Sequence, residues 1–127
     1  MFDLSKFKAF DFSEGVPYVS VTNNGLTFNK SVIMKMGYPA YVRMLTNEED
    51  RQIALQVCNE KEEKAVQFYK EKANGVLSVR WNSKDLINTV SRMCEWDLSN
   101  FSYRINGTYI AEDNIMLFEL DKATRMT

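Results

Sequence analysis

A weak internal repeat is the feature that most constrains what this sequence can fold into. The segment from Asn24 to Ile33 resembles the segment from Asn74 to Ile87, with a three-residue insertion in the second copy. Self-similarity at this scale is typical of a duplicated supersecondary unit, so we expect two copies of one unit in a single domain of 127 residues. Two shorter segments recur later in the same order, residues 41–44 at 102–105 and residues 53–55 at 115–117.

The first copy predicts a β-β-α-β-β unit. An Asn-Gly pair at 24–25 favours a tight hairpin turn between two stretches that alternate between polar and apolar side chains. Asn29 is a good N-cap for a helix of about two turns, which Gly37 ends. The four strands are expected at residues 18–22, 26–28, 40–45 and 51–57.

The second copy repeats this pattern with a longer helix. Asn82 followed by Asp85 predicts the helix start, because the carboxylate would lie at the positive end of the helix dipole. An Asn-Gly turn at 106–107 is expected after a strand at 101–105, and the apolar run 115–118 predicts a strand buried on both faces. The helix carries an apolar stripe at helical spacing that should pack on the sheet, formed by Leu86, Ile87, Val90, Met93 and Cys94.

Two segments are open to more than one interpretation. Residues 59–73 have the charge spacing of a helix, whereas the repeat makes Val66 and Phe68 strand residues equivalent to Val19 and Val21, and we favour the strand. The extension at 1–14 has the spacing of neither a strand nor a helix, and we expect it to pack over an open edge of the sheet. Its large apolar residues are Phe2, Leu4, Phe7, Phe10 and Phe12.

These patterns together predict an α+β fold that is rich in strands. Two tandem β-β-α-β-β units, at residues 15–58 and 59–127, would form one compact domain with pseudo-twofold symmetry. Residues 1–14 would be an N-terminal extension of that domain.

The composition excludes several classes of chemistry. The absence of histidine removes Ser-His and Cys-His nucleophile pairs and histidine-ligated metal sites. Cys58 and Cys94 lack a metal-binding spacing and predict small buried side chains in a reducing compartment. The acidic clusters lie in polar turns, where solvent keeps the carboxylates ionised and unsuited to general acid catalysis. We therefore expect a non-enzymatic protein that needs no cofactor and no metal.

Hydropathy and charge bear on location and partners. No apolar run approaches the ~18–20 residues that a membrane-spanning helix needs, and the first six residues lack the apolar core of a signal peptide. We therefore expect a cytoplasmic protein that does not bind a membrane. The 16 basic and 17 acidic side chains are spread evenly, so a nucleic-acid-binding surface would have to arise from local placement of cations.

The order of these elements resembles that of the SpoVT/AbrB-like swapped-hairpin family of transition-state regulators and MazE-type antitoxins. The resemblance covers residues 19–57, with a looser match in the second copy, and implies a swapped-hairpin barrel that binds DNA, here fused within one chain. Leu26 and Asn29 stand where the family commonly has arginine and proline, so the resemblance implies the fold more strongly than the DNA binding. It is carried by Gly25, Thr27, Val32, Met36 and Gly37.

Two functional hypotheses follow. The first is a small bacterial or phage DNA-binding regulator, in which Arg43 and Arg104 occupy matching outward positions of the two copies and contact phosphates. The alternative is a protein-interaction or oligomerisation module without DNA binding, whose open strand edges contact a protein partner or a second copy of the chain. The candidate nucleic-acid-binding residues are Arg43, Arg104, Arg80, Lys30 and Lys35.

Overall fold

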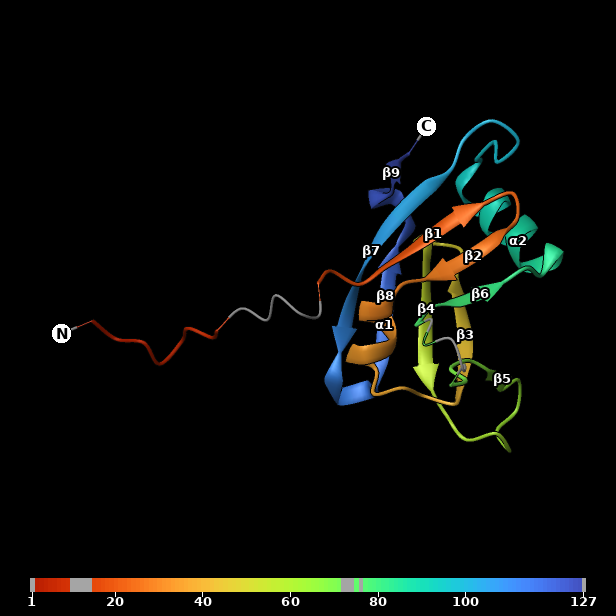
Figure 1. Cartoon of the computed structure of the whole chain (residues 1–127). Coiled ribbons are helices and arrows are strands. Elements are labelled where there is room, and N and C mark those ends of the chain that lie inside the picture. The colour runs from red at the N-terminus through yellow and green to blue at the C-terminus, as the bar shows by residue number, and fades with distance from the viewer. Residues whose placement is uncertain (1, 10–14, 72–74, 76, 127) are drawn as a thin grey trace.

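In the part of the chain that the structure describes, nine antiparallel strands form one strongly curled sheet, a half-barrel, which two α-helices accompany (Figure 1). The computed structural model describes residues 2–9, 15–71, 75 and 77–126. The expected α+β class, rich in strands, is confirmed. The elements are β1 (Tyr18–Thr22), β2 (Gly25–Phe28), α1 (Lys30–Lys35), β3 (Tyr41–Asn47), β4 (Gln52–Val57), β5 (Val66–Gln67), β6 (Val79–Trp81), α2 (Lys84–Cys94), β7 (Tyr103–Ile110), η1 (Ala111–Asp113), β8 (Ile115–Glu119), η2 (Leu120–Lys122) and β9 (Thr124–Arg125).

The strands are neighbours in the order β5-β3-β4-β8-β7-β1-β2-β6, and β9 pairs with the first part of β7. The β4–β8 pair joins the hairpin β3–β4 to the hairpin β7–β8. The long strand β7 then passes from β8 at one end to β1 at the other. One continuous sheet therefore runs through the chain, with β5 and β6 at the two ends of this strand order.

Alternating apolar side chains on the inner side of the curled sheet form the core. Across the β4–β8 pair, Ile53 lies opposite Phe118 and Leu55 lies opposite Met116, and none of the four is more than 1% exposed. Burial of side chains of this size stabilises the fold by about 1.5–3 kcal/mol each. The strands β1, β2, β6 and β7 add Val19, Val21, Leu26, Phe28, Val79 and Ile105 to the same core.

Asn29 connects the start of α1 to the start of β1. Its side-chain oxygen accepts hydrogen bonds from the backbone N–H groups of Val32 at 3.3 Å and Tyr18 at 3.0 Å, and its amide nitrogen donates to the carbonyl oxygen of Val16 at 2.8 Å. The predicted N-cap is therefore confirmed, because a short polar side chain satisfies an orphan N–H group of the helix.

The helix α2 begins one residue later than the sequence indicates. Its N-cap is Ser83, whose hydroxyl oxygen accepts a hydrogen bond from the N–H group of Leu86 at 3.3 Å, so the expected start at Asn82 is wrong. The stripe that faces the core is confirmed at Ile87, Val90 and Met93, which are buried.

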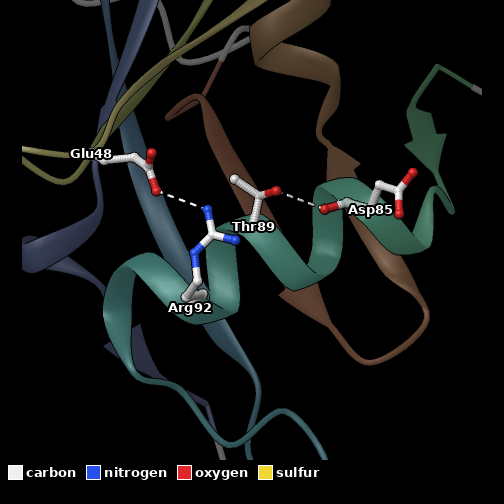
Figure 2. A network of polar contacts seen from close by, with 4 residues as sticks. All are labelled: Glu48, Asp85, Thr89 and Arg92. Atoms are coloured by element: carbon white, nitrogen blue, oxygen red, sulfur yellow. Dashed lines mark hydrogen bonds and ion pairs between the residues drawn. The ribbon is translucent and has the colours of Figure 1, made fainter.

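An ion pair connects α2 to the loop of the β3–β4 hairpin (Figure 2). A guanidinium nitrogen of Arg92 lies 2.9 Å from a carboxylate oxygen of Glu48, and one turn earlier the Thr89 hydroxyl donates to the carbonyl oxygen of Asp85. Both members of the pair are more than half exposed, so the pair contributes at most about 1 kcal/mol. Apolar packing, not this pair, holds α2 in place.

The expected turn at 106–107 is wrong, because both residues lie within β7. Asn106 is opposite Tyr18 of β1, and Gly107 is opposite Phe118 of β8. The chain reverses instead at residues 111–114, after Ile110. Burial on both faces of the 115–118 strand is also wrong in part, because Ile115 and Leu117 are only half-buried.

The two ambiguous segments have different outcomes. Within 59–71 the structure has turns followed by the two-residue strand β5, with no helix in these residues. The expected strand is therefore confirmed at Val66, whereas Phe68, also expected in it, lies just after its end. The N-terminal expectation is wrong for the residues that the structure describes, since Phe2, Leu4 and Phe7 are 66–73% exposed and pack on no edge. Phe10 and Phe12 lie outside the described residues.

Gly107 generates a prediction about the core. A Cβ atom at this position would lie 2.8 Å from the sulfur of Met116 and 2.9 Å from a ring carbon of Phe118. We expect Gly107→Ala to lower the free energy of unfolding by about 1–3 kcal/mol, because the core must shift to admit a methyl group. Urea denaturation measures this change. Thr108→Ala, next along β7 and exposed, serves as the control and should change stability by less than about 0.5 kcal/mol.

Candidate nucleic-acid interface

Two arginines and two hydroxyl side chains line up across four strands on the outer side of the sheet. Arg104 on β7 lies opposite Ser20 on β1, and Ser20 lies opposite Thr27 on β2. Thr27 in turn lies opposite Arg80 on β6. We call these four residues the outer row. Neighbouring strands are about 4.8 Å apart, so the row spans about 14 Å from β7 to β6.

The pleat of the strands directs the outer row away from the core. Ser20 stands between the buried residues Val19 and Val21, and Thr27 stands between the buried residues Leu26 and Phe28. Because successive side chains of a strand point to opposite faces, the polar residues between buried ones face outward.

The strand positions around the outer row carry no acidic side chain. On β1, β2, β6, β9 and residues 103–106 of β7, all of which the structure describes, the outward positions hold only polar, glycine or arginine residues. A surface of this composition attracts anions, because nothing in the same strands neutralises the arginines. The polar neighbours of the row are Tyr18, Thr22, Asn106 and Thr124.

Arg104 is held in position by an aromatic ring. Its guanidinium carbon lies 4.0 Å from the centroid of the Tyr18 ring, a cation–π contact that still leaves N–H groups able to donate hydrogen bonds. Its Nε atom is buried and has no hydrogen-bond partner in the described part of the chain. The stacked ring limits the motion of the side chain before any ligand arrives.

Arg43 belongs to the other half of the sheet. It lies on β3 opposite Gln56, and a guanidinium nitrogen of Arg43 donates to the Gln56 side-chain oxygen. Met44, Leu45 and Glu63 join it around a shallow hollow of about 200 Å³. The structure therefore does not bring Arg43 together with Arg104.

The expected correspondence of Arg43 and Arg104 is wrong. Arg43 lies four residues before the last pair of its hairpin, Asn47 with Gln52, whereas Arg104 lies six residues before the corresponding residue Ile110. An alignment that superposes the two arginines therefore disagrees with the registers of the two hairpins.

The two remaining predicted cations, Lys30 and Lys35, lie at the two ends of α1, the helix that follows β2. Lys30 is the exposed first residue of α1, two residues beyond the end of β2, so it does not belong to the outer row. Lys35 is the last residue of the same helix and is half-buried. Of the five predicted cations, the outer row contains Arg104 and Arg80.

Sequence reasoning did not identify Ser20, Thr27 or Tyr18 as part of this surface. The alternation of β1 places Ser20 on the polar face, which is visible in the sequence. Its position between Arg104 and Thr27 depends on pairings between distant strands, which the sequence does not display.

Comparison of the chain with protein-family models, curated proteins and solved structures gives no match. Among the described residues, no helix is long and apolar enough to cross a membrane. In that same part of the chain no three histidine, cysteine or acidic side chains are placed to hold a metal ion.

The Tyr18–Arg104 contact generates a prediction. A double-mutant cycle of Tyr18→Leu and Arg104→Met should give a coupling free energy of about 0.5–1 kcal/mol in chemical denaturation, because the cation–π contact needs both partners. The same cycle with Arg43→Met in place of Arg104→Met should give no coupling, since Arg43 lies on a distant strand. Equal coupling in both cycles would contradict the assigned contact.

Proposed function

We propose that this protein binds nucleic acid, as a DNA-binding regulator, through the outer face of β7, β1, β2 and β6. The observation that carries the proposal is the outer row, in which Arg104 and Arg80 flank two hydroxyl side chains and the described strands around them place no carboxylate on the same face. Arginine donates bidentate hydrogen bonds to phosphate, and serine and threonine hydroxyls are common donors to the same oxygens.

The spacing of the outer row suits a duplex. The major groove of B-DNA is about 12 Å wide, and the two arginines stand about 14 Å apart across three strand spacings. Arg104 and Arg80 would then contact phosphates on the two sides of the groove, while Ser20 and Thr27 face the space between them.

We further propose that the sheet is a fused swapped-hairpin barrel with pseudo-twofold symmetry. Exchange of β1–β4 with β5–β8 leaves the run β5-β3-β4-β8-β7-β1 unchanged when it is read from the other end. The β2–β6 pair also maps onto itself. The β1–β2 pair would map onto a β5–β6 pair that the sheet lacks, so the barrel is open between those two strands.

The loops of the two long hairpins support the same duplication. Residues 48–51 and 111–114 join β3 to β4 and β7 to β8, and each loop contains a Glu-Asp pair. Each loop also ends on a residue in the left-handed backbone region, Arg51 and Asn114, both with φ of 54°. Positive φ is uncommon for residues other than glycine, so its recurrence at matching loop ends supports a common origin.

We also propose that the protein is not an enzyme and that it is located in the cytoplasm, a reducing compartment. Burial raises the pKa of the Cys94 thiol, and burial followed by the charge of Glu62 raises that of Cys58. A thiol with a raised pKa carries little thiolate and is a poor nucleophile. Both cysteines are free thiols, which suits a reducing compartment.

Binding of labelled duplex DNA at increasing salt tests the proposal. Arg104→Ala and Arg80→Ala should each weaken binding about tenfold and reduce the log–log salt slope by about 0.9 for each lost phosphate contact. Arg92→Ala removes the same charge from the exposed side of α2 and should leave binding unchanged. Arg43→Ala should also have little effect, because it lies outside the outer row.

Three outcomes would overturn the proposal. They are a lack of binding at low salt, binding that does not weaken as salt rises, and equal losses in the Arg92 and Arg104 variants. The last outcome would mean that DNA responds to overall charge and not to this face of the sheet.

A further inference from the structure

The two strands at the ends of the strand order, β5 and β6, lie beside each other without pairing. The rings of Phe68, directly after β5, and Trp81, at the end of β6, have centroids 5.7 Å apart. Within the described residues, however, β5 pairs only with β3, and β6 pairs only with β2. We call this gap between β5 and β6 the open seam. Each of its strands has an unpaired edge, which is a template for an added strand.

An apolar cavity lies in the open seam. It has a volume of about 390 Å³, and its apolar walls come from Met44, Val66, Trp81 and Leu86. Arg80 lies at its rim and also borders a second hollow of about 220 Å³ between the same two strands. The cavity is large enough for one or two large apolar side chains, within the usual range of binding pockets.

The N-terminal extension of the chain supplies unburied apolar side chains. Phe2, Leu4 and Phe7 are 73%, 66% and 66% exposed, and residues 2–9 run away from the sheet in Figure 1. The ring of Phe2 lies 5.4 Å from the ring of Phe7 in the same extension. Exposed apolar residues that cluster in one segment mark an interaction site.

The pattern of this extension matches the two sides of the open seam. In an extended strand, Phe2 and Leu4 point to one side and Asp3 points to the other. On β6, Trp81 faces the cavity and Arg80 faces outward. An inserted strand with Phe2 and Leu4 in the cavity therefore places the Asp3 carboxylate beside the Arg80 guanidinium on the outer face.

We propose that residues 2–4 of one protein molecule insert into the open seam of a second copy, and that two such insertions form a reciprocal dimer. Burial of a phenylalanine removes about 150–250 Å² from water, so two insertions with their matching seam surfaces bury on the order of 1,200 Å². This area is within the range of stable protein interfaces. The added strand also occupies the position that a β5–β6 pair would close.

The experiment measures the mass of the full-length chain by sedimentation equilibrium over a range of concentrations. Phe2→Ser with Leu4→Ser removes the inserted side chains, and Leu86→Lys blocks the cavity; each variant should weaken dimerisation at least tenfold. Asn88→Lys, an exposed position on the same helix, is the matched control and should still dimerise. A mixture of the two defective variants should form a one-to-one complex. The Leu86 variant supplies an intact extension, and the Phe2 and Leu4 variant supplies an intact open seam.

A charge exchange distinguishes specific insertion from general hydrophobic adhesion. Asp3→Arg and Arg80→Asp should each weaken dimerisation, and the double variant should restore it, because the pair is re-formed with reversed charges. Dimerisation is measured without nucleic acid, and DNA binding is measured on the monomeric Phe2 and Leu4 variant, in which no Asp3 of a second copy lies beside Arg80. That variant should still bind DNA, so failure of the dimer and failure of the nucleic-acid proposal are separate results.

Several results would overturn the dimer proposal. A wild-type chain that is monomeric at all concentrations overturns it. This holds also if the chain is monomeric because Phe2 is buried in the seam of its own molecule. A dimer that survives Leu86→Lys, a mixture that stays monomeric, or a charge exchange without rescue also overturns it.

Discussion

The antiparallel register of the curled sheet is the constraint on which the rest of the molecule depends. A strand alternates its side chains between two faces, so the pairing of one residue determines the side on which every other residue of that strand lies. With Ile53 opposite Phe118 and Leu55 opposite Met116, the two long hairpins share one interior. A shift of one residue in that pair would turn the core side chains of one of the two strands, Ile53 and Leu55 or Met116 and Phe118, toward water.

The same register produces the outer face. Val19, Val21 and Ile105 face the core, so Ser20 and Arg104 between and beside them face outward and lie opposite each other. Of the two arginines of the outer row, Arg80 is exposed, and Arg104 is half-buried against the ring of Tyr18. Packing on the inner side and anion attraction on the outer side are thus two results of one set of strand pairs.

Most local features were predictable from the sequence, although α2 begins one residue later than expected, and features that depend on distant pairing were not predictable. The N-cap at Asn29 and the core stripe of α2 follow from interactions within a few residues, and both are present. The turn expected at 106–107 was wrong because β1 and β8 pair with β7 on either side of that point. An Asn-Gly pair favours a turn locally, and contacts from distant strands overrode that preference.

The candidate site shows the same division. The sequence singled out Arg104 from the internal repeat and Arg80 as a further cation, but their alignment through Ser20 and Thr27 requires three long-range pairs. The resemblance between the two copies predicted that Arg43 is the counterpart of Arg104. The registers of the hairpins β3–β4 and β7–β8 exclude that correspondence. A few identical residues cannot distinguish between two alignments of β3 with β7 that differ by two positions.

Interstrand NOEs in the NMR spectrum of the labelled protein test the central claim most directly. The register described here predicts backbone NOEs that join Arg104 to Ser20, Ser20 to Thr27 and Thr27 to Arg80 in one transverse row. NOEs displaced by one residue on any of these strands, or none between β2 and β6, would separate the arginines and contradict the account.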